Sequence, residues 1–202
     1  MNGDFLEHYF TNSTELKSEF RTIKYNYKDY QFVFTSDNGV FSKGKIDFGS
    51  KVLVETFLDN NDKKIESILD VGCGYGYIGV VLAKVLNVPT TLIDVNKRAV
   101  HLTEKNIKEN KINACTFVSN VYENVKEKFD LIITNPPIRA GKRIVYDILK
   151  KAKNFLNDNG ELWFVIRKEQ GAKSTIKDME ELYKVDVIKR VKGFYIIRAK
   201  ID

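Results

Sequence analysis

The segment LDVGCGYG, residues 69–76, gives the clearest indication of how this chain folds. A short run of buried-type residues at 67–71 predicts a strand, and IGVVLAKVL at 78–86 predicts an apolar helix directly after the glycines. Glycines between a strand and a helix let the backbone turn sharply, so the amides at the start of the helix can approach a ligand. The stretch therefore predicts a ligand site at the end of a strand.

The alternation of strand and helix continues along most of the chain. Apolar residues spaced three and four apart predict further helices at 49–58, 95–106, 145–155, which ends at the turn NDNG (157–160), and 176–183. Further strands are expected at 90–94, 116–119, 129–134, 161–166, 185–191 and 194–199, the last two as a hairpin around Lys192 and Gly193. We therefore expect an α/β, Rossmann-like fold: seven strands, mostly parallel, an antiparallel C-terminal hairpin, and helices on both faces.

The first 40 residues have a different pattern. Aromatic residues there alternate with polar ones, at Tyr25, Tyr27, Tyr30, Phe32 and Phe34. Two short strands around a turn near Lys28 and Asp29, closed by the turn SDNG at 36–39, are the simplest interpretation; a strand added to another sheet's edge is the alternative. We expect residues 1–40 to form a β extension packed on the core, and 41–202 to form the main domain.

The composition of the chain bears on its possible partners and on its location in the cell. The 202 residues carry 33 Lys and Arg against 27 Asp and Glu, a net charge of +6, which is compatible with a polyanionic partner. No apolar run approaches the roughly 20 residues that cross a bilayer, and the N-terminus is polar where a signal peptide is apolar. We expect a cytoplasmic protein, with a monomer favoured.

Cysteine and histidine are too few for a metal site. Cys73 and Cys115 are expected to be buried thiols in a reducing compartment, and His8 and His101 lie in unlike contexts. Without a cluster of these residues, no zinc site is expected. A catalytic triad is disfavoured, because neither histidine follows a predicted strand with turn glycines around it.

The ends of the first two strands of this pattern predict a nucleoside-bearing cofactor. Asp94 ends a strand roughly 20 residues after Gly72, where a carboxylate can accept both hydroxyls of a ribose. The glycines at 72, 74 and 76 are spaced G-x-G-x-G, whereas a pyrophosphate site is usually G-x-G-x-x-G. Asp70 before the loop would repel phosphate but suits an ammonium group. The pattern therefore favours S-adenosylmethionine.

Two further strand ends offer polar groups. Asn120 follows the third strand and is a candidate either for the adenine edge or for a plain turn. The fourth strand ends in Asn135, Pro136 and Pro137. Consecutive prolines fix the backbone, so the Asn135 side-chain oxygen and the Pro136 carbonyl can accept both N–H groups of an amine and direct its lone pair at a methyl sulfonium.

Together these residues resemble the class I S-adenosylmethionine-dependent methyltransferases, and more closely the small-subunit ribosomal RNA guanine-N2 methyltransferases of the RsmC type. The resemblance covers about residues 30–200. It rests on DNGVFSKGKIDFGS (37–50), LDVGCGYG (69–76), SNVYENVKEKFDLIITNPPI (119–138), GELW (160–163) and GFYIIRAK (193–200).

The resemblance implies roles for individual residues. The target amine would be held by Asn135, Pro136, Pro137 and Ile138. The complete set of candidates for cofactor binding is Asp47, Gly49, Asp70, Gly72, Cys73, Gly74, Asp94, Val95, Asn120, Val121 and Asn135. Cations beyond the pocket are candidates for phosphate contacts, namely Arg139, Lys142, Arg143, Arg167 and Lys168, extended by Lys43 and Lys45.

The chain departs from the family pattern in two respects. Larger RsmC-type proteins carry a degenerate methyltransferase-like half before the catalytic one, where this chain has the short aromatic segment. Many amine-methylating relatives place an aromatic residue after the prolines, and this chain has Ile138, which offers no π face.

The expected function is methyl transfer to guanine N2 of 16S ribosomal RNA, with rRNA or the 30S subunit as partner. Adenine-N6 methylation of nucleic acid, glutamine-N5 methylation of release factors, and RNA binding without turnover remain alternatives. A nicotinamide dehydrogenase is disfavoured by the glycine spacing.

Overall fold

A seven-stranded sheet forms the centre of the protein, in a computed structural model that describes residues 19–37 and 44–201. The strands lie in the order β5-β4-β3-β6-β7-β9-β8. They are β3 (Ile68–Val71), β4 (Thr90–Asp94), β5 (Ala114–Val118), β6 (Phe129–Thr134), β7 (Leu156–Arg167), β8 (Lys184–Val191) and β9 (Phe194–Lys200). Strands β3 to β7 pair in parallel and β9 runs antiparallel between β7 and β8, which confirms the predicted sheet.

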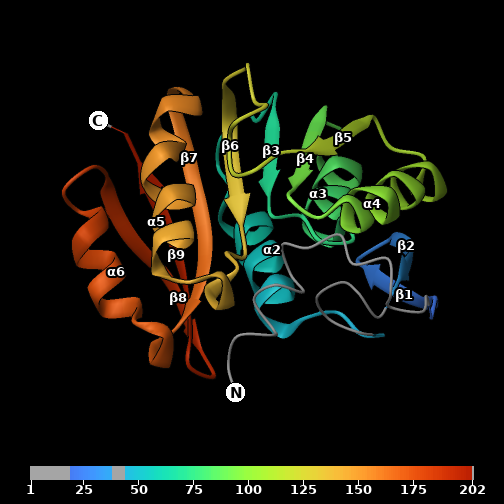
Figure 1. The fold of residues 1–202 in the computed structure, drawn as a ribbon, viewed down its shortest axis with the longest axis horizontal. Helices are drawn as coiled ribbons and strands as arrows, with labels where there is room; N and C mark the ends of the chain where they lie inside the picture. Colours follow the sequence, from blue (N-terminus) through green and yellow to red (C-terminus); the bar gives the residue numbers. More distant parts are fainter. Residues whose placement is uncertain (1–18, 38–43, 202) are drawn as a thin grey trace.

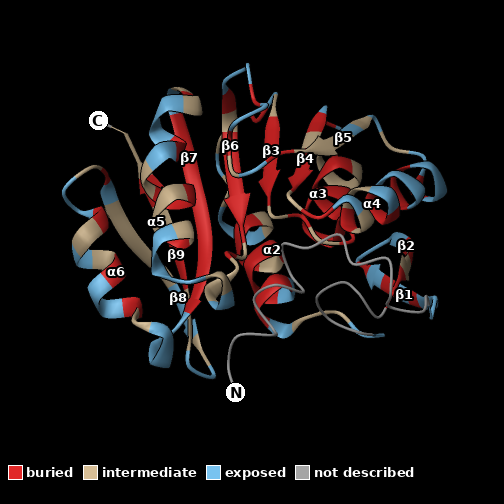
Figure 2. Cartoon of the chain, viewed as in Figure 1, coloured by how far each residue is buried: buried red, intermediate tan, exposed pale blue. Residues whose placement is uncertain are grey.

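Helices cover both faces of the sheet (Figure 1). They are α2 (Phe48–Asn60), α3 (Tyr77–Leu86), α4 (Lys97–Asn110), α5 (Lys142–Lys151) and α6 (Ala172–Met179), with 3-10 turns η1 (Ile138–Ala140), η2 (Ala152–Phe155) and η3 (Lys168–Gln170). Leu131 packs with the α2–α3–α4 layer and its neighbour Ile132 with the α5–α6 layer, because successive strand residues point to opposite faces. Figure 2 shows the resulting core, with buried residues along the central strands and the inner sides of the helices.

Several predicted boundaries differ from the structure, among them those of α4 (Lys97–Asn110, predicted at 95–106) and β5 (Ala114–Val118, predicted at 116–119). Two other differences have a clear physical reason. Residues 157–160, predicted as a turn after a helix, form a bulge within β7: Phe129 pairs with Leu156 and Leu131 with Glu161, so these four residues lie opposite Asp130. The Asp130 carboxylate accepts the Asn157 side-chain amide at 2.8 Å, which supports the bulge.

The helix predicted at 176–183 is α6, which begins earlier, after Gly171 with φ of 87°, and ends at Met179. Ala172, Thr175 and Met179 form its buried side. Tyr183 lies beyond the helix, and its hydroxyl donates to the Leu149 carbonyl at 2.8 Å. Tyr183 fitted the apolar spacing of a helix, but it is buried because it packs on α5, not because it belongs to α6.

The N-terminal hairpin is formed as predicted by β1 (Arg21–Tyr27) and β2 (Tyr30–Ser36). Side chains of α4 pair with the free edge of β2: Asn106 bonds both the N–H and the carbonyl of Thr35, and Asn110 does the same at Val33. The hairpin therefore lies against α4. The turn expected at 36–39 extends outside the described residues, and the division of the chain at residue 40 stays a prediction.

The two cysteines have different environments. Cys73 is buried, whereas Cys115 is exposed, so the prediction of a buried thiol was wrong for Cys115. Cys115 lies on β5, the edge strand of the sheet, where no neighbouring strand covers its outer side. Among residues 19–37 and 44–201, no helix is both long and apolar enough to span a membrane, and no three His, Cys, Asp or Glu residues are grouped to hold a metal ion.

Candidate active site

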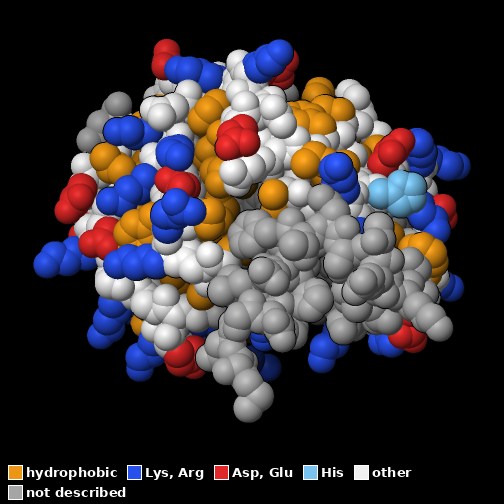
Figure 3. Space-filling model, viewed as in Figure 1, with side chains coloured by type: hydrophobic (Ala, Val, Ile, Leu, Met, Phe, Trp, Pro, Cys, Tyr) orange, Lys and Arg blue, Asp and Glu red, His pale blue; other side chains and the backbone are white. Residues whose placement is uncertain are grey.

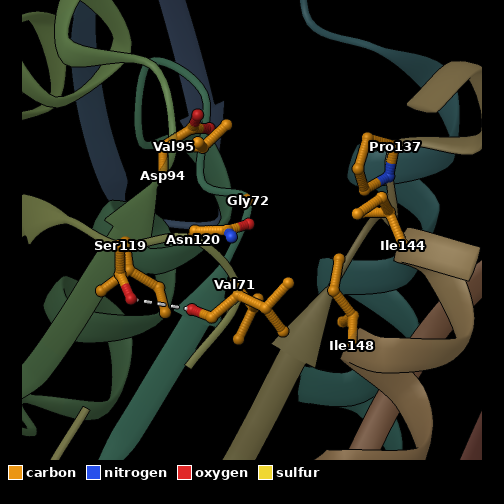
Figure 4. Close-up of a pocket in the computed structure, with 11 residues that line it drawn as sticks. Val71, Gly72, Asp94, Val95, Ser119, Asn120, Pro137, Ile144 and Ile148 are labelled. Carbon is orange, nitrogen blue, oxygen red and sulfur yellow. Dashed lines mark hydrogen bonds between the residues drawn. The ribbon is translucent and has the colours of Figure 1, made fainter. Parts of the chain in front are cut away.

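A pocket opens at the carboxyl ends of β3, β4 and β5, as expected for a parallel sheet. Asp94, Ser119 and Asn120 line one side, and Pro137 and the α5 residues Ile144 and Ile148 line the other (Figure 4). The complete lining is Val71, Gly72, Ile93, Asp94, Val95, Ser119, Asn120, Val121, Pro137, Ile144 and Ile148.

The glycine loop brings bare backbone to this pocket. Gly72 and Gly74 have φ of 72° and 59°, a region that side chains disfavour. Among the described residues, a Cβ added to Gly72 would have only the Pro137 Cδ atom, at 4.0 Å, near it, which leaves space in front of Gly72 for a ligand. The N–H of Gly74 donates to Asp94 at 2.9 Å, which fixes the loop on the end of β4.

Asp94 is held by backbone donors on both oxygens. Oδ2 accepts the Gly74 N–H and Oδ1 accepts the Asn96 N–H, each at 2.9 Å. Burial raises the pKa of Asp94 from 3.8 to about 6, and the hydrogen bonds from Asn96, Gly74 and Val95 oppose this rise. At neutral pH the carboxylate is therefore ionised, which suits an acceptor for ribose hydroxyls.

Asp70 lies beneath the glycine loop and faces α3. Its Oδ2 accepts the Gly79 N–H at 2.8 Å, and its Oδ1 is a buried oxygen without a partner among the described residues. Burial raises the pKa of Asp70 to about 7, and the nearby Asp94 adds to this rise. Asp70 is fully buried and does not line the pocket, so a direct contact with a cofactor ammonium stays a prediction.

Cys73 is also outside the pocket lining. Its sulfur lies 3.6 Å from the Thr103 hydroxyl, and burial raises the pKa of the thiol well above its ordinary value. The environment is that of a packed thiol, and the predicted contact of Cys73 with the cofactor remains untested.

The end of β5 forms a tight turn at the pocket. The Ser119 hydroxyl donates to the Val121 carbonyl at 3.0 Å and accepts the Asn124 N–H at 3.1 Å. Val121 has φ of 52°, which is rare for a β-branched residue and marks a constrained backbone. Asn120 is exposed and its amide donates to Glu123 at 3.0 Å, leaving the residue at the pocket rim where an adenine edge could meet it.

The Asn-Pro-Pro turn follows β6 beside the pocket. The Thr134 hydroxyl donates to the Val71 carbonyl at 2.7 Å, which joins the ends of β6 and β3. The Asn135 side-chain nitrogen then donates to Asp47 Oδ2 at 3.0 Å and to Ser50 Oγ at 2.9 Å. Asp47 is the N-cap of α2, since the same oxygen accepts the Ser50 N–H at 2.8 Å.

These contacts orient the Asn135 amide. Both acceptors lie on its nitrogen side, so the carbonyl oxygen points elsewhere and has no partner in the part of the chain that the structure describes. Pro136 is buried and Pro137 is part of the pocket wall. Ile138 packs on the α5–α6 side of the core. The turn therefore presents an acceptor next to the pocket.

Gly49 completes the contact between this turn and β9. A Cβ on Gly49 would lie 2.8 Å from Cε1 of Phe194 and 3.1 Å from Asp47 Oδ2, so only glycine lets the ring and the carboxylate approach so closely. Neither Asp47 nor Gly49 lines the pocket. Their predicted role in closing the cofactor site stays a prediction, and both lie beside Asn135.

The predicted phosphate-binding cations lie on the surface near this end of the sheet. Arg139, Lys142, Arg143, Arg167 and Lys168 are all exposed. Lys142 faces α6, with Nζ 3.9 Å from Asp178 and 4.7 Å from the ring centre of Tyr146. Lys45 is exposed and Lys43 lies outside the described residues. Figure 3 shows lysines and arginines gathered over the side that carries α5 and α6.

Several residues of the site were not predicted from the sequence. Ser119, Ile144 and Ile148 line the pocket, and Ser50 holds the Asn135 amide. Ile144 and Ile148 are one helical turn apart, and this spacing indicated a helix face without showing that the face borders a ligand site. Ser50 could have been found from its place in the first turn of the helix that follows Asp47, close to the predicted site residues Asp47 and Gly49.

Comparisons with known proteins identify the family. Residues 31–198 match the family model "methyltransferase small domain". The chain is 46% identical over 200 residues to an uncharacterized protein, YbxB, of Bacillus subtilis, covering 96% of this chain and 98% of that protein.

Two characterised proteins are also similar. Identity is 38% over 133 residues with the ribosomal RNA small subunit methyltransferase C of Photorhabdus laumondii, covering 63% of this chain and 38% of that protein, so the chain spans well under half of its length. The T. thermophilus 16S rRNA N2 methyltransferase RsmC, solved with AdoMet and guanosine, has a TM-score of 0.82 at 23% identity, covering 93% of this chain and 52% of that one. That likeness confirms the Rossmann-like methyltransferase fold.

The open space at Gly72 and the ionised Asp94 fit a nucleoside-bearing cofactor. The family agrees with this geometry: the chain belongs to the methyltransferase small domain family, whose cofactor is S-adenosylmethionine.

Proposed function

We propose that this protein transfers a methyl group from S-adenosylmethionine to the exocyclic N2 amine of a guanine in small-subunit ribosomal RNA. The orientation of Asn135 carries the proposal: with its nitrogen bonded to Asp47 and Ser50, its oxygen is available to an N–H donor beside the cofactor pocket. The names of the similar methyltransferases support rRNA as the substrate.

The chemistry depends on how an amine is presented. The lone pair of an exocyclic base amine is delocalised into the ring, so the amine is a poor nucleophile. Acceptors at both N–H groups, the Asn135 oxygen and the Pro136 carbonyl, would draw the nitrogen towards a tetrahedral geometry. S-adenosylmethionine, when bound, would supply a methyl group on a positively charged sulfur. That sulfur would leave as the neutral thioether of S-adenosylhomocysteine, and the methylated amine would lose one proton to water. Positioning and charge stabilisation then provide most of the catalysis.

The remaining residues have assigned roles in this proposal. Gly72, Asp94 and Asn120 would hold the cofactor. The exposed cations Arg139 and Arg143 would contact phosphates of the RNA, and Arg167 and Lys168 would do so at the end of β7. A set of cations near the amine site favours a nucleic-acid substrate over a release factor.

The product of the reaction tests the proposal. The protein is incubated with labelled S-adenosylmethionine and 30S subunits, naked rRNA, DNA or release factor, and the modified product is identified after digestion. N2-methylguanosine is expected. Label in N6-methyladenine or glutamine would refute the proposal, and cofactor and RNA binding without any product would indicate a non-catalytic assembly factor.

Asn135→Ala tests the assigned acceptor. We expect methyl transfer to be lost, because the amine loses an acceptor, while the cofactor Kd in calorimetry stays within about threefold of wild type. Asn120→Ala, at the end of β5, is the matched control, with weaker cofactor binding and retained kcat at saturating cofactor. A large rise in cofactor Kd for Asn135→Ala would make Asn135 part of the cofactor site.

A further inference from the structure

Two phenylalanines from distant parts of the chain meet near Asn135. Phe48, at the start of α2, and Phe194, at the start of β9, have ring centres 5.5 Å apart. A cation lies over each ring, because Lys192 Nζ is 5.1 Å from the centre of Phe48 and the Arg167 guanidinium is 5.1 Å from the centre of Phe194. Phe48 is 37% exposed, which is unusual for a side chain of this size.

Lys168 belongs to the same region. Its N–H donates to the Gly193 carbonyl at 2.8 Å, which ties the end of β7 to the turn between β8 and β9. Arg167, Lys168 and Lys192 are all exposed. A carboxylate oxygen of Glu169 lies 3.3 Å from Arg167 Nε. We call Phe48, Arg167, Lys168, Lys192 and Phe194 the aromatic–cation surface.

This surface borders the proposed amine site. A Cβ on Gly49 would lie 2.8 Å from Phe194 and 3.1 Å from Asp47 Oδ2, so the ring and the carboxylate are separated by little more than one glycine. The same Asp47 oxygen accepts the Asn135 amide at 3.0 Å. Phe194 therefore lies beside the carboxylate that holds Asn135, and Phe48 is in contact with Phe194.

We propose that the aromatic–cation surface binds the RNA strand next to the target guanine. An unpaired flanking base stacks on the Phe48 ring or on the Arg167 plane, and Lys168 and Lys192 contact phosphates. This inference rests on the proposed function and extends it to residues outside the cofactor and amine sites.

The chemistry of the surface favours single-stranded RNA over a protein partner. Bases stack on aromatic rings and on arginine planes, and both are present within one small area. Three exposed cations, Arg167, Lys168 and Lys192, belong to the surface, against two carboxylates beside it. Asp47 is bonded to Ser50 and Asn135, and Glu169 is exposed, so a phosphate can replace Glu169 as the partner of Arg167. The surface also supplies the π face that Ile138 lacks, from α2 and β9.

Equilibrium binding to RNA tests the surface. The probe is a fluorescein-labelled, single-stranded fragment of small-subunit rRNA, titrated with cofactor-loaded protein at several salt concentrations. Phe48→Leu keeps an apolar side chain but removes the ring, and we expect about tenfold weaker binding. Arg167→Ala and Lys192→Ala should each weaken binding and lower the salt slope by about one.

Matched controls come from the same fold. Arg190 lies over Tyr195, 5.0 Å from the ring centre, on the same β8–β9 hairpin, but Tyr195 packs on the other face of the sheet. Phe20 is 60% exposed with Lys105 over its ring, and lies at the N-terminal hairpin. Arg190→Ala and Phe20→Leu should bind RNA as wild type does.

The outcomes separate this inference from the proposed function. If wild type methylates the RNA but Phe48→Leu, Arg167→Ala and Lys192→Ala bind it no more weakly than the controls, the surface is refuted and the proposed function stands. If wild type binds RNA without methylating it, the proposed function fails, and the affinities of the same variants still decide the surface. If wild type does not bind RNA, both fail.

Discussion

Replacing Asp47 by alanine removes two hydrogen bonds that one carboxylate oxygen accepts. The bond from the Ser50 N–H, at 2.8 Å, caps α2, and the bond from the Asn135 amide, at 3.0 Å, orients the proposed acceptor. Loss of an N-cap costs about 1 kcal/mol, which lowers Tm by about 2–4 °C in a chain of this size. A hydrogen bond to a charged group contributes about 1.5–3 kcal/mol. Without the bond to Asp47, the Asn135 side-chain amide can rotate so that its oxygen and nitrogen exchange places. We expect kcat to fall about tenfold to a hundredfold.

Three measurements on Asp47→Ala separate these effects: kcat with saturating RNA, cofactor Kd by calorimetry, and Tm. Asp47→Asn keeps an acceptor oxygen and should retain most of kcat. Asn96→Ala removes the comparable cap of α4, which accepts the Arg98 N–H at 2.8 Å, and should lower Tm with kcat preserved. An unchanged kcat in Asp47→Ala would refute the orienting role. A higher cofactor Kd at unchanged kcat would support the predicted cofactor contact of Asp47 instead.

The two buried carboxylates give predictions of pH dependence. Burial raises the pKa of Asp70 to about 7, so the folded protein keeps a proton that the unfolded chain releases near pH 4, and stability should fall as pH rises from about 4 to 7. Asp70→Asn should show a weaker dependence of Tm on pH and a higher Tm than wild type at pH 8. If Tm changes equally with pH in the two proteins, Asp70 is not the group responsible. The pKa of Asp94 is raised to about 6, so cofactor affinity in calorimetry should weaken as pH falls below 6, because the protonated form accepts hydrogen bonds less well. Asp94→Asn should bind the cofactor weakly at every pH, and a wild-type affinity for this variant would remove Asp94 from the site.

The parts of the fold that local sequence determines were predictable. The bounds of β4 and β6 match the prediction residue for residue, because each contains aliphatic and β-branched residues and is followed within two residues by an asparagine, which favours a turn. The glycine loop and Asp94 could be placed for the same reason. The alternation of strand side chains explains the direction of Asp70: Val71 lines the pocket, so Asp70 points to the opposite face, where it meets α3.

The remaining features depend on contacts between distant segments. The bond between Asn135 and Ser50 joins residues 85 positions apart, and nothing in either local sequence indicates the other. Ile148 borders the pocket because α5 lies on the side opposite Asp94, Ser119 and Asn120 (Figure 4). Phe48 and Phe194 meet because β9 inserts between β7 and β8, which brings the start of β9 to the start of α2.

The same geometry argues against a carboxylate base in the proposed reaction. Asp94, whose pKa is raised, lines the cofactor pocket and is bonded to the N–H groups of Gly74 and Asn96. Asp70, whose pKa is also raised, is buried outside the pocket and is bonded to the Gly79 N–H. Asp47 is the carboxylate in contact with Asn135, and it lies on the nitrogen side of that amide, away from the oxygen assigned to the target. The groups left to act on the amine are neutral acceptors in a turn fixed by two prolines. In the proposed reaction, catalysis would then depend on where Asn135 is held, and the hydrogen bonds from Asn135 to Asp47 and Ser50 would position it.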